Sequence, residues 1–103
     1  MRTFFKVTAG AIIALASISA IASPQVDLKA YNCLSCHTVD KKLVGPSFTA
    51  IGERYRSDAS ARAKLIEKVK RGGSGAWGPV PMPANPQVPA SAVPGLVDHI
   101  LKQ

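Results

Sequence analysis

The stretch Cys33-Leu34-Ser35-Cys36-His37 decides how the rest of this sequence is interpreted. It has the pattern C-x-x-C-H, to which a c-type haem is attached. On one helical turn the two thiols point the same way, so each can add to one vinyl group of the haem. The adjacent His37 then lies under the iron and offers a ring nitrogen as the proximal ligand. The motif therefore predicts one covalently bound haem c, held by Cys33 and Cys36, with His37 as an iron ligand.

Three other uses of the cysteine pair fit the sequence less well. A thioredoxin-like dithiol needs a βαβ context, and no stretch of this sequence alternates apolar and polar residues with period two. A structural zinc site needs four ligands, and the available candidates are Cys33, Cys36, His37 and His99, so all four would have to bind the metal. A plain disulfide leaves the histidine beside the motif unexplained.

Two side chains compete for the second axial position on the iron, Met82 and His99, because the common pairs are His/Met and His/His. Met82 lies between Pro81 and Pro83. A stiff loop limits the conformations that carry the sulfur away from the iron, which lowers the entropy cost of ligation. His99 lies in an amphipathic segment next to Ile100, where a half-exposed surface histidine is expected. We predict Met82 as the sixth ligand.

The first residues have the pattern of a secretory signal. Arg2 and Lys6 give a positive start, residues 7–18 are almost wholly apolar or small, and residues 20–22 fit the small-x-small cleavage rule. The apolar stretch is shorter than the roughly 20 residues of a membrane span. We expect residues 1–22 to be cleaved off, residues 23–103 to form one domain in the periplasm, and no stable insertion in the membrane.

Composition gives two further constraints on the predicted mature domain. So small a domain usually needs a staple, a metal or a cofactor, and its aromatic residues are few: Tyr31, Phe48, Tyr55 and Trp77. A haem would supply the missing apolar volume. Without Arg2 and Lys6, the predicted mature domain has 11 Lys and Arg against 6 Asp and Glu, a formal net charge of +5, compared with +7 for the whole chain. This excess suits an acidic protein partner or a membrane surface, and nucleic acid is not expected as a partner.

The apolar spacing predicts an all-α domain of about four short helices with long loops. Gly45-Pro46 marks a loop, Gly72-Gly73 stops a helix, and the prolines between Trp77 and Pro89 exclude regular structure there. The expected helices run from Ser23 into the cysteine motif, from Ser47 or Phe48 to Tyr55, from near Asp58 to Gly72, and from Ala90 or Ser91 to Lys102 with Pro94 in the first turn.

From Pro24 onward the chain resembles the short bacterial class I monohaem cytochromes c of the c-551/c-552 type. The resemblance is most specific in the C-x-x-C-H motif, in Leu43–Pro46 (LVGP) and in Trp77–Pro83 (WGPVPMP) followed by Asn85. It implies a helical fold wrapped around one haem, His/Met ligation of the iron, and shuttling of electrons between redox enzymes.

The resemblance also implies roles for single residues. The carbonyl of Pro46 would accept a hydrogen bond from the distal nitrogen of His37 and fix its ring. Trp77 would donate its indole N–H to a haem propionate, and the amide of Asn85 would hold the ligand sulfur. Lys68 falls where the family often has an arginine near the propionates, and it could pair with them as a point charge.

The predicted function is outer-sphere transfer of single electrons by a monomeric carrier, not enzymatic catalysis. The expected partners are redox proteins, such as a membrane quinol-oxidising complex as donor and a terminal oxidase or nitrite reductase as acceptor. Lys41 and Lys42 would steer an acidic partner. The alternatives are a small haem enzyme with an open sixth site and a haem subunit of a larger oxidoreductase. The expected exposed haem edge is bordered by Leu34, Leu43, Val44, Pro79, Val80 and Pro83.

Overall fold

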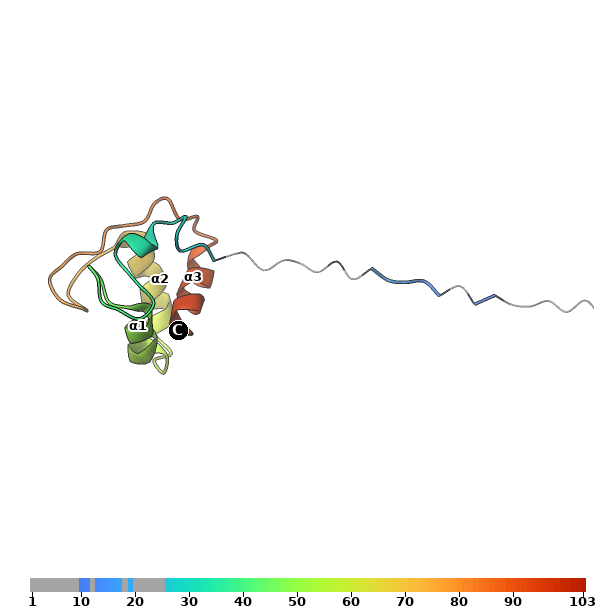
Figure 1. Ribbon diagram of the computed structural model, residues 1–103, viewed down its shortest axis with the longest axis horizontal. Helices are drawn as coiled ribbons and strands as arrows, with labels where there is room; N and C mark the ends of the chain where they lie inside the picture. The colour runs from blue at the N-terminus through green and yellow to red at the C-terminus, as the bar shows by residue number, and fades with distance from the viewer. Residues whose placement is uncertain (1–9, 12, 18, 20–25) are drawn as a thin grey trace, which may run out of the picture.

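The computed structural model describes residues 10–11, 13–17, 19 and 26–103 (Figure 1). The predicted signal start at Arg2 and Lys6 and the predicted cleavage site after Ala22 lie outside these residues, so export stays a prediction. Within the described residues, no helix combines the length and apolar character that crossing a membrane requires.

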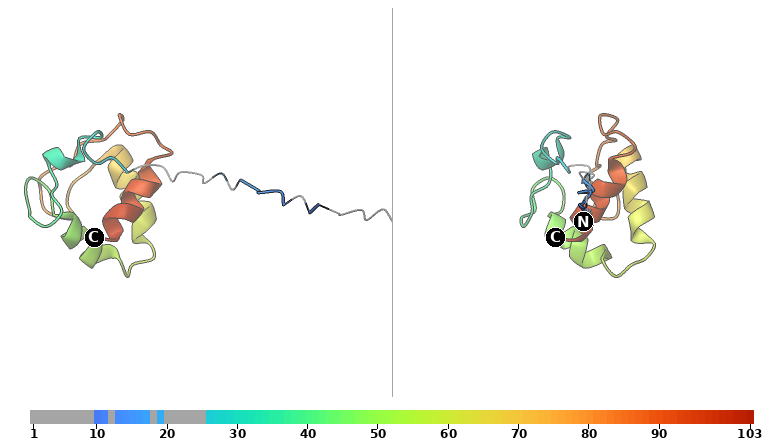
Figure 2. Two further views of the ribbon diagram at one scale, coloured as in Figure 1. Left: turned by 45° about the vertical axis from the view of Figure 1, so that its right-hand side comes forward. Right: turned by 90° about the vertical axis from the view of Figure 1, so that its right-hand side faces the viewer.

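Over residues 26–103 the domain is formed by three α-helices and one short 3-10 helix. They are η1 (Cys33–Ser35), α1 (Phe48–Tyr55), α2 (Ala61–Arg71) and α3 (Val93–Leu101). Helix α3 packs against both α1 and α2, and the long connection over residues 72–92 arches away from the helices before it returns to α3 (Figures 1 and 2). The β-structure of the described residues is an isolated bridge between Gly73 and Met82. The predicted all-α fold is therefore confirmed.

Helix α1 begins where the sequence predicts. The side-chain oxygen of Ser47 accepts a hydrogen bond from the backbone N–H of Ala50 at 3.1 Å, which caps the helix. The side chains of Phe48 and Ile51 are buried, with 1% and 8% of their surface exposed. The capping residue and the apolar face together fix the helix beside the loop that follows the cysteine motif.

Helix α2 begins three residues after the predicted start. Asp58 accepts hydrogen bonds from the backbone N–H of Ser60 at 2.9 Å and from its hydroxyl at 2.7 Å, and so forms a turn before Ala61. These hydrogen bonds hold the pKa of the Asp58 carboxyl below its ordinary value. The helix ends at Gly72, whose φ is 71°, as the glycine pair predicts.

The buried core lies mainly on α3. Val88, Val93, Leu96 and Val97 form one cluster, packed against the partly buried faces of α2 and of the segment before the cysteine motif. The helix begins at Val93 and not at Ala90 or Ser91, and a turn precedes it. Pro94 occupies the first turn, where its missing N–H costs no hydrogen bond.

The segment before the cysteine motif differs from the prediction of a continuous helix. Residues 28–32 form turns, and η1 follows them. Asn32 has a φ of 64°, in the left-handed region, and its side chain accepts a hydrogen bond from the Ser35 hydroxyl. A left-handed residue interrupts a right-handed helix. The prediction was therefore wrong for residues 26–36, and its first part lies outside the described residues.

Candidate haem-binding site

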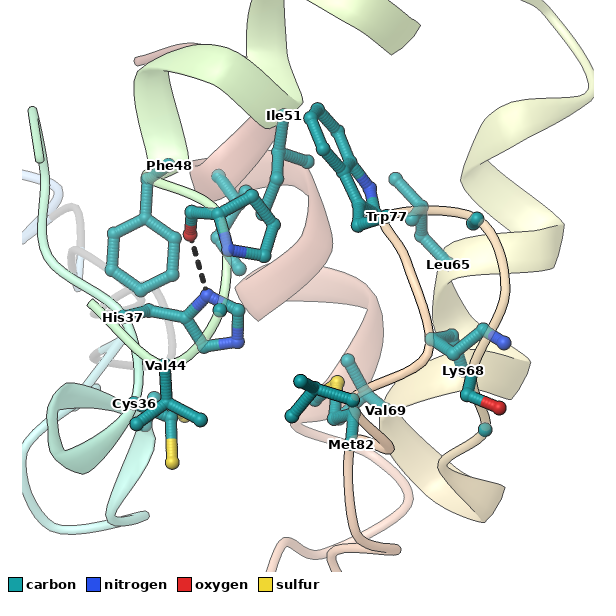
Figure 3. Close-up of a pocket in the computed structure, with 18 of the residues that line it drawn as sticks. Cys36, His37, Val44, Phe48, Ile51, Leu65, Lys68, Val69, Trp77 and Met82 are labelled. Atoms are coloured by element: carbon teal, nitrogen blue, oxygen red, sulfur yellow. Dashed lines mark hydrogen bonds between the residues drawn. The ribbon is translucent and has the colours of Figure 1, made fainter. Parts of the chain in front are cut away.

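A cavity of about 400 Å³ opens between η1, α1, α3 and the loop that follows α2 (Figure 3). Its lining is mainly apolar. All eight residues that the sequence singles out line this cavity, although they come from four separate parts of the chain: Cys33, Cys36, His37, Pro46, Lys68, Trp77, Met82 and Asn85. The fold thus gathers the complete predicted set around one space.

Cys33 is the first residue of the short helix η1, and Cys36 is the residue that follows its end. Both are free thiols and both are half-buried. Burial raises the pKa of the Cys33 thiol above its ordinary value. Leu34 and Ser35, which separate the cysteines, are exposed. One tight turn therefore directs both thiols to the cavity wall and the intervening residues to solvent.

His37 is held from two sides. Its Nδ1 lies 2.7 Å from the carbonyl oxygen of Pro46, and its ring stacks on Phe48 with centroids 5.4 Å apart and planes 22° apart. Because a carbonyl can only accept, Nδ1 carries the proton, and Nε2 keeps a free lone pair. Figure 3 shows this second ring nitrogen turned to the cavity. The predicted contact with Pro46 is present in the structure.

Gly45 contributes to the same arrangement, which sequence reasoning missed. A Cβ at this position would lie 2.5 Å from Cε1 and 2.9 Å from Nδ1 of His37. Such distances are far shorter than van der Waals contact. Only glycine lets the backbone lie this close to the imidazole. In the sequence Gly45 was visible as part of a loop and of the Leu43–Pro46 motif, but without a role toward His37.

Met82 lies across the cavity from His37 (Figure 3). Its side chain is half-buried. Its backbone N–H donates to the carbonyl of Gly73 at 2.8 Å, and its carbonyl accepts from the N–H of Gly73 at 2.9 Å. The loop of residues 79–85, here called the Met82 loop, is thus hydrogen-bonded to the residue that follows the end of α2, and its prolines also stiffen it.

Trp77 is at the cavity mouth, with 42% of its surface exposed. The ring of Tyr55 meets it edge-on at 6.2 Å. The guanidinium of Arg54 lies 4.5 Å from the indole centroid and donates to the carbonyl of Ala76 at 2.7 Å. Arg54 therefore brings a positive charge to the side of the cavity where Trp77 lies. No local pattern in the sequence joins residues this far apart along the chain.

Lys68 and Asn85 flank the end of α2. Lys68 is half-buried and lines the cavity. The amide nitrogen of Asn85 donates to the carbonyl of Val69 at 2.9 Å and to that of Pro83 at 3.2 Å. In this structure Asn85 braces the backbone around the Met82 loop, and its predicted bond to the ligand sulfur stays a prediction.

The chemistry of the donor set fits a haem. Two thiols on one turn, an imidazole and a thioether on opposite walls, and an apolar lining match covalent attachment with two axial ligands. In the part of the chain that the structure describes, no three His, Cys, Asp or Glu side chains gather into a cage for a bare metal ion. Fold and site together define a small all-α protein of the covalent haem c class.

Comparison with known proteins identifies the family. The cytochrome c family profile matches residues 27–102. Cytochrome c-551 of Allochromatium vinosum is 46% identical over 69 residues, which cover 67% of this chain and 73% of that protein. Cytochrome c-552 of Nitrosomonas europaea is 39% identical over 85 residues, which cover 82% of each chain. The chain belongs to the cytochrome c family, as a small class I monohaem member with one covalently attached haem c.

Solved structures agree with this assignment. The crystal structure of wild-type N. europaea cytochrome c552 is similar with a TM-score of 0.69 and 40% sequence identity, over 72% of this chain and 91% of that one. The class 1 cytochrome MtoD of Sideroxydans lithotrophicus gives a TM-score of 0.60 at 34% identity, over 73% and 86% of the two chains. The predicted fold and cofactor are thereby confirmed.

Proposed function

We propose that this chain is a periplasmic carrier of single electrons in which His37 and Met82 are the axial ligands of the haem iron. The observation that carries the proposal is the placement of these two side chains on opposite walls of one apolar cavity (Figure 3). Both free cysteines line the same cavity. Membership of the cytochrome c family supports electron transfer as the activity.

The residues around the cavity would tune and hold the iron. The haem supplies one-electron redox chemistry when it is bound. The Pro46 carbonyl keeps Nδ1 of His37 protonated and increases the basicity of Nε2. A thioether from Met82 raises the reduction potential relative to a second histidine. The pinned Met82 loop limits reorganisation between the two oxidation states, which favours fast outer-sphere transfer.

The cavity mouth offers a surface for brief contact with redox partners. Val44 and Val80 line the cavity and have 52% and 61% of their surface exposed. Their apolar neighbours along the chain, Leu34 and Leu43, are 43% and 52% exposed. Lys41 and Lys42 are exposed on the same loop as Leu43. We expect weak encounters with acidic faces, such as those of a quinol-oxidising complex and of a terminal oxidase or nitrite reductase. Reduction rates that do not change with salt would contradict this steering.

The ligand assignment is tested by replacing Met82. The oxidised wild-type protein should show the weak red absorption band of a sulfur–iron bond, and Met82→Ala should abolish it. Val80→Ala is the matched control, because it shortens an exposed side chain in the same loop and should keep the band. Survival of the band in Met82→Ala would show that another group ligates the iron. Rapid binding of carbon monoxide by the wild-type ferrous protein would instead favour a haem enzyme with an open sixth site.

The location is tested separately. The protein expressed with its first 22 residues should appear in the periplasmic fraction, and its mass should equal that of residues 23–103 plus one haem. A mass that retains residues 1–22 would contradict cleavage, whereas the mass of the bare polypeptide would contradict covalent attachment.

A further inference from the structure

The end of α2 is joined to the Met82 loop by hydrogen bonds at the methionine itself and at Asn85. Gly73 and Met82 exchange two hydrogen bonds, of 2.8 and 2.9 Å. Three residues further on, Asn85 donates to the carbonyl of Val69 from its backbone N–H at 3.2 Å and from its side chain at 2.9 Å. The end of α2 therefore holds the Met82 loop in place.

Gly72 lies where the end of α2 comes close to the backbone of the Met82 loop. Its φ of 71° and ψ of −164° fall in a region that is essentially restricted to glycine. A Cβ on Gly72 would overlap the carbonyl oxygen of Met82 and lie 2.7 Å from the backbone nitrogen of Ala84 and from the carbonyl carbon of Pro83. All three neighbours are backbone atoms, so none of them can move aside by a side-chain rotation.

A side chain at position 72 must therefore push the Met82 loop away from α2. The two hydrogen bonds between Gly73 and Met82 hold the residue next to the contact, so a displacement at Gly72 is passed directly to the methionine. Ligation geometry depends on small distances, because supporting residues must hold a ligand to within about 0.5 Å. The loop cannot absorb the shift locally, since Pro81 and Pro83 fix the backbone on both sides of Met82.

We infer that Gly72 is a positioning residue for the sixth ligand: it sets the distance between α2 and the Met82 loop, and thereby the strength with which Met82 holds the iron. This inference rests on the proposed His/Met ligation. It assigns to Gly72 a role beyond that of ending α2. The absence of a side chain is what the site requires at this position.

The test compares two glycine substitutions in the holoprotein, Gly72→Ala and Gly75→Ala. Both place alanine at a positive φ, 71° for Gly72 and 103° for Gly75, but a Cβ on Gly75 meets no atom within 4 Å. Added imidazole is the probe, and loss of the red band in the ferric protein reports displacement of Met82. We expect the apparent affinity for imidazole to rise about tenfold or more in Gly72→Ala, a change of about 1.4 kcal/mol, and to stay within about twofold of wild type in Gly75→Ala.

The possible outcomes separate this inference from the proposed function. Equal imidazole affinities for Gly72→Ala and Gly75→Ala would overturn the role of Gly72, while a wild-type protein without the red band would overturn Met82 ligation itself. If Gly72→Ala does not accumulate in folded form, Gly73→Ala replaces it. The φ of Gly73 is 139°, so alanine there strains the residue that is hydrogen-bonded to Met82. The nearest atoms to a Cβ on Gly73 belong to the flexible side chain of Lys68 and not to the backbone. Its imidazole affinity should exceed that of Gly75→Ala, and equality would again refute the inference.

Discussion

Replacing Phe48 with alanine should remove a large part of the stability of the holoprotein. Phe48 is 1% exposed, and its ring stacks on His37 at a centroid distance of 5.4 Å. Truncation of a buried phenylalanine costs about 3–5 kcal/mol, and the loss of an aromatic pair adds about 0.5–1.5 kcal/mol. Since whole domains have about 5–15 kcal/mol of stability, the variant should fold but unfold much more readily.

The assay is equilibrium unfolding of both holoproteins in guanidinium chloride at pH 7. With a denaturant dependence of about 3 kcal/mol per molar, the combined loss of about 3.5–6.5 kcal/mol lowers the midpoint by about 1.2–2.2 M. Val80→Ala is the control, because Val80 is 61% exposed and a surface change of this kind stays within about 0.5 kcal/mol. A midpoint for Phe48→Ala within about 0.3 M of wild type would refute the reasoning, since it would mean that the ring carries little of the core.

Two further predictions concern an exposed ion pair and the wall behind the proximal histidine. Asp98→Asn removes the pair with Arg62, whose N–O distance is 2.7 Å and whose side chains are 43% and 51% exposed, and should lower the free energy of unfolding at pH 7 by at most about 1 kcal/mol. The hydrogen bond from Arg62 lowers the pKa of Asp98. The stabilisation by the pair is therefore present above the ordinary pKa of an aspartate and is lost as the pH falls through the lowered value. Urea unfolding curves of variant and wild type should converge in acid, and a gap that stays constant with pH would contradict this. Gly45→Ala places a methyl group 2.5 Å from Cε1 of His37, which should turn the imidazole away from the Pro46 carbonyl and make it a weaker donor to the iron. The reduction potential of the haem should then rise by up to about 60 mV, equal to a tenfold change in a one-electron equilibrium. A redox titration measures this, with Gly95→Ala as the control because its methyl meets no atom within 4 Å; equal potentials for Gly45→Ala and wild type would disprove the effect.

Features encoded by local pattern were predictable from the sequence. The cysteine motif, the serine cap of α1 and the glycine end of α2 each depend on residues within a few positions of one another, and the structure has them where the pattern indicates. The turns before the motif were not predictable in the same way. The apolar spacing of that segment favours a helix, but Asn32 takes a left-handed φ of 64°. Asparagine tolerates this conformation, and apolar spacing gives no sign of it.

The contacts that complete the site are set by tertiary packing. Arg54 reaches Trp77 and the carbonyl of Ala76 only because α1 and the loop after α2 meet in space. The same holds for Gly72, which in the sequence is only a helix stop. The role of each of these residues follows from the groups that it contacts in the folded chain, and neither periodicity nor spacing along the chain carries that information.

The two predicted axial ligands are supported by the same physical device. A backbone glycine lies against each of them: Gly45 against the imidazole of His37, and Gly72 against the backbone of Met82. In both places a Cβ would collide with the ligand or its loop, and in both the residue that follows the glycine, Pro46 or Gly73, is hydrogen-bonded to the ligand residue. The exposed apolar rim has no such constraint, because its side chains face solvent. Substitutions in the rim should therefore alter partner choice while leaving the reduction potential unchanged. Adding one methyl group at Gly45 or Gly72 should instead alter the ligation of the iron.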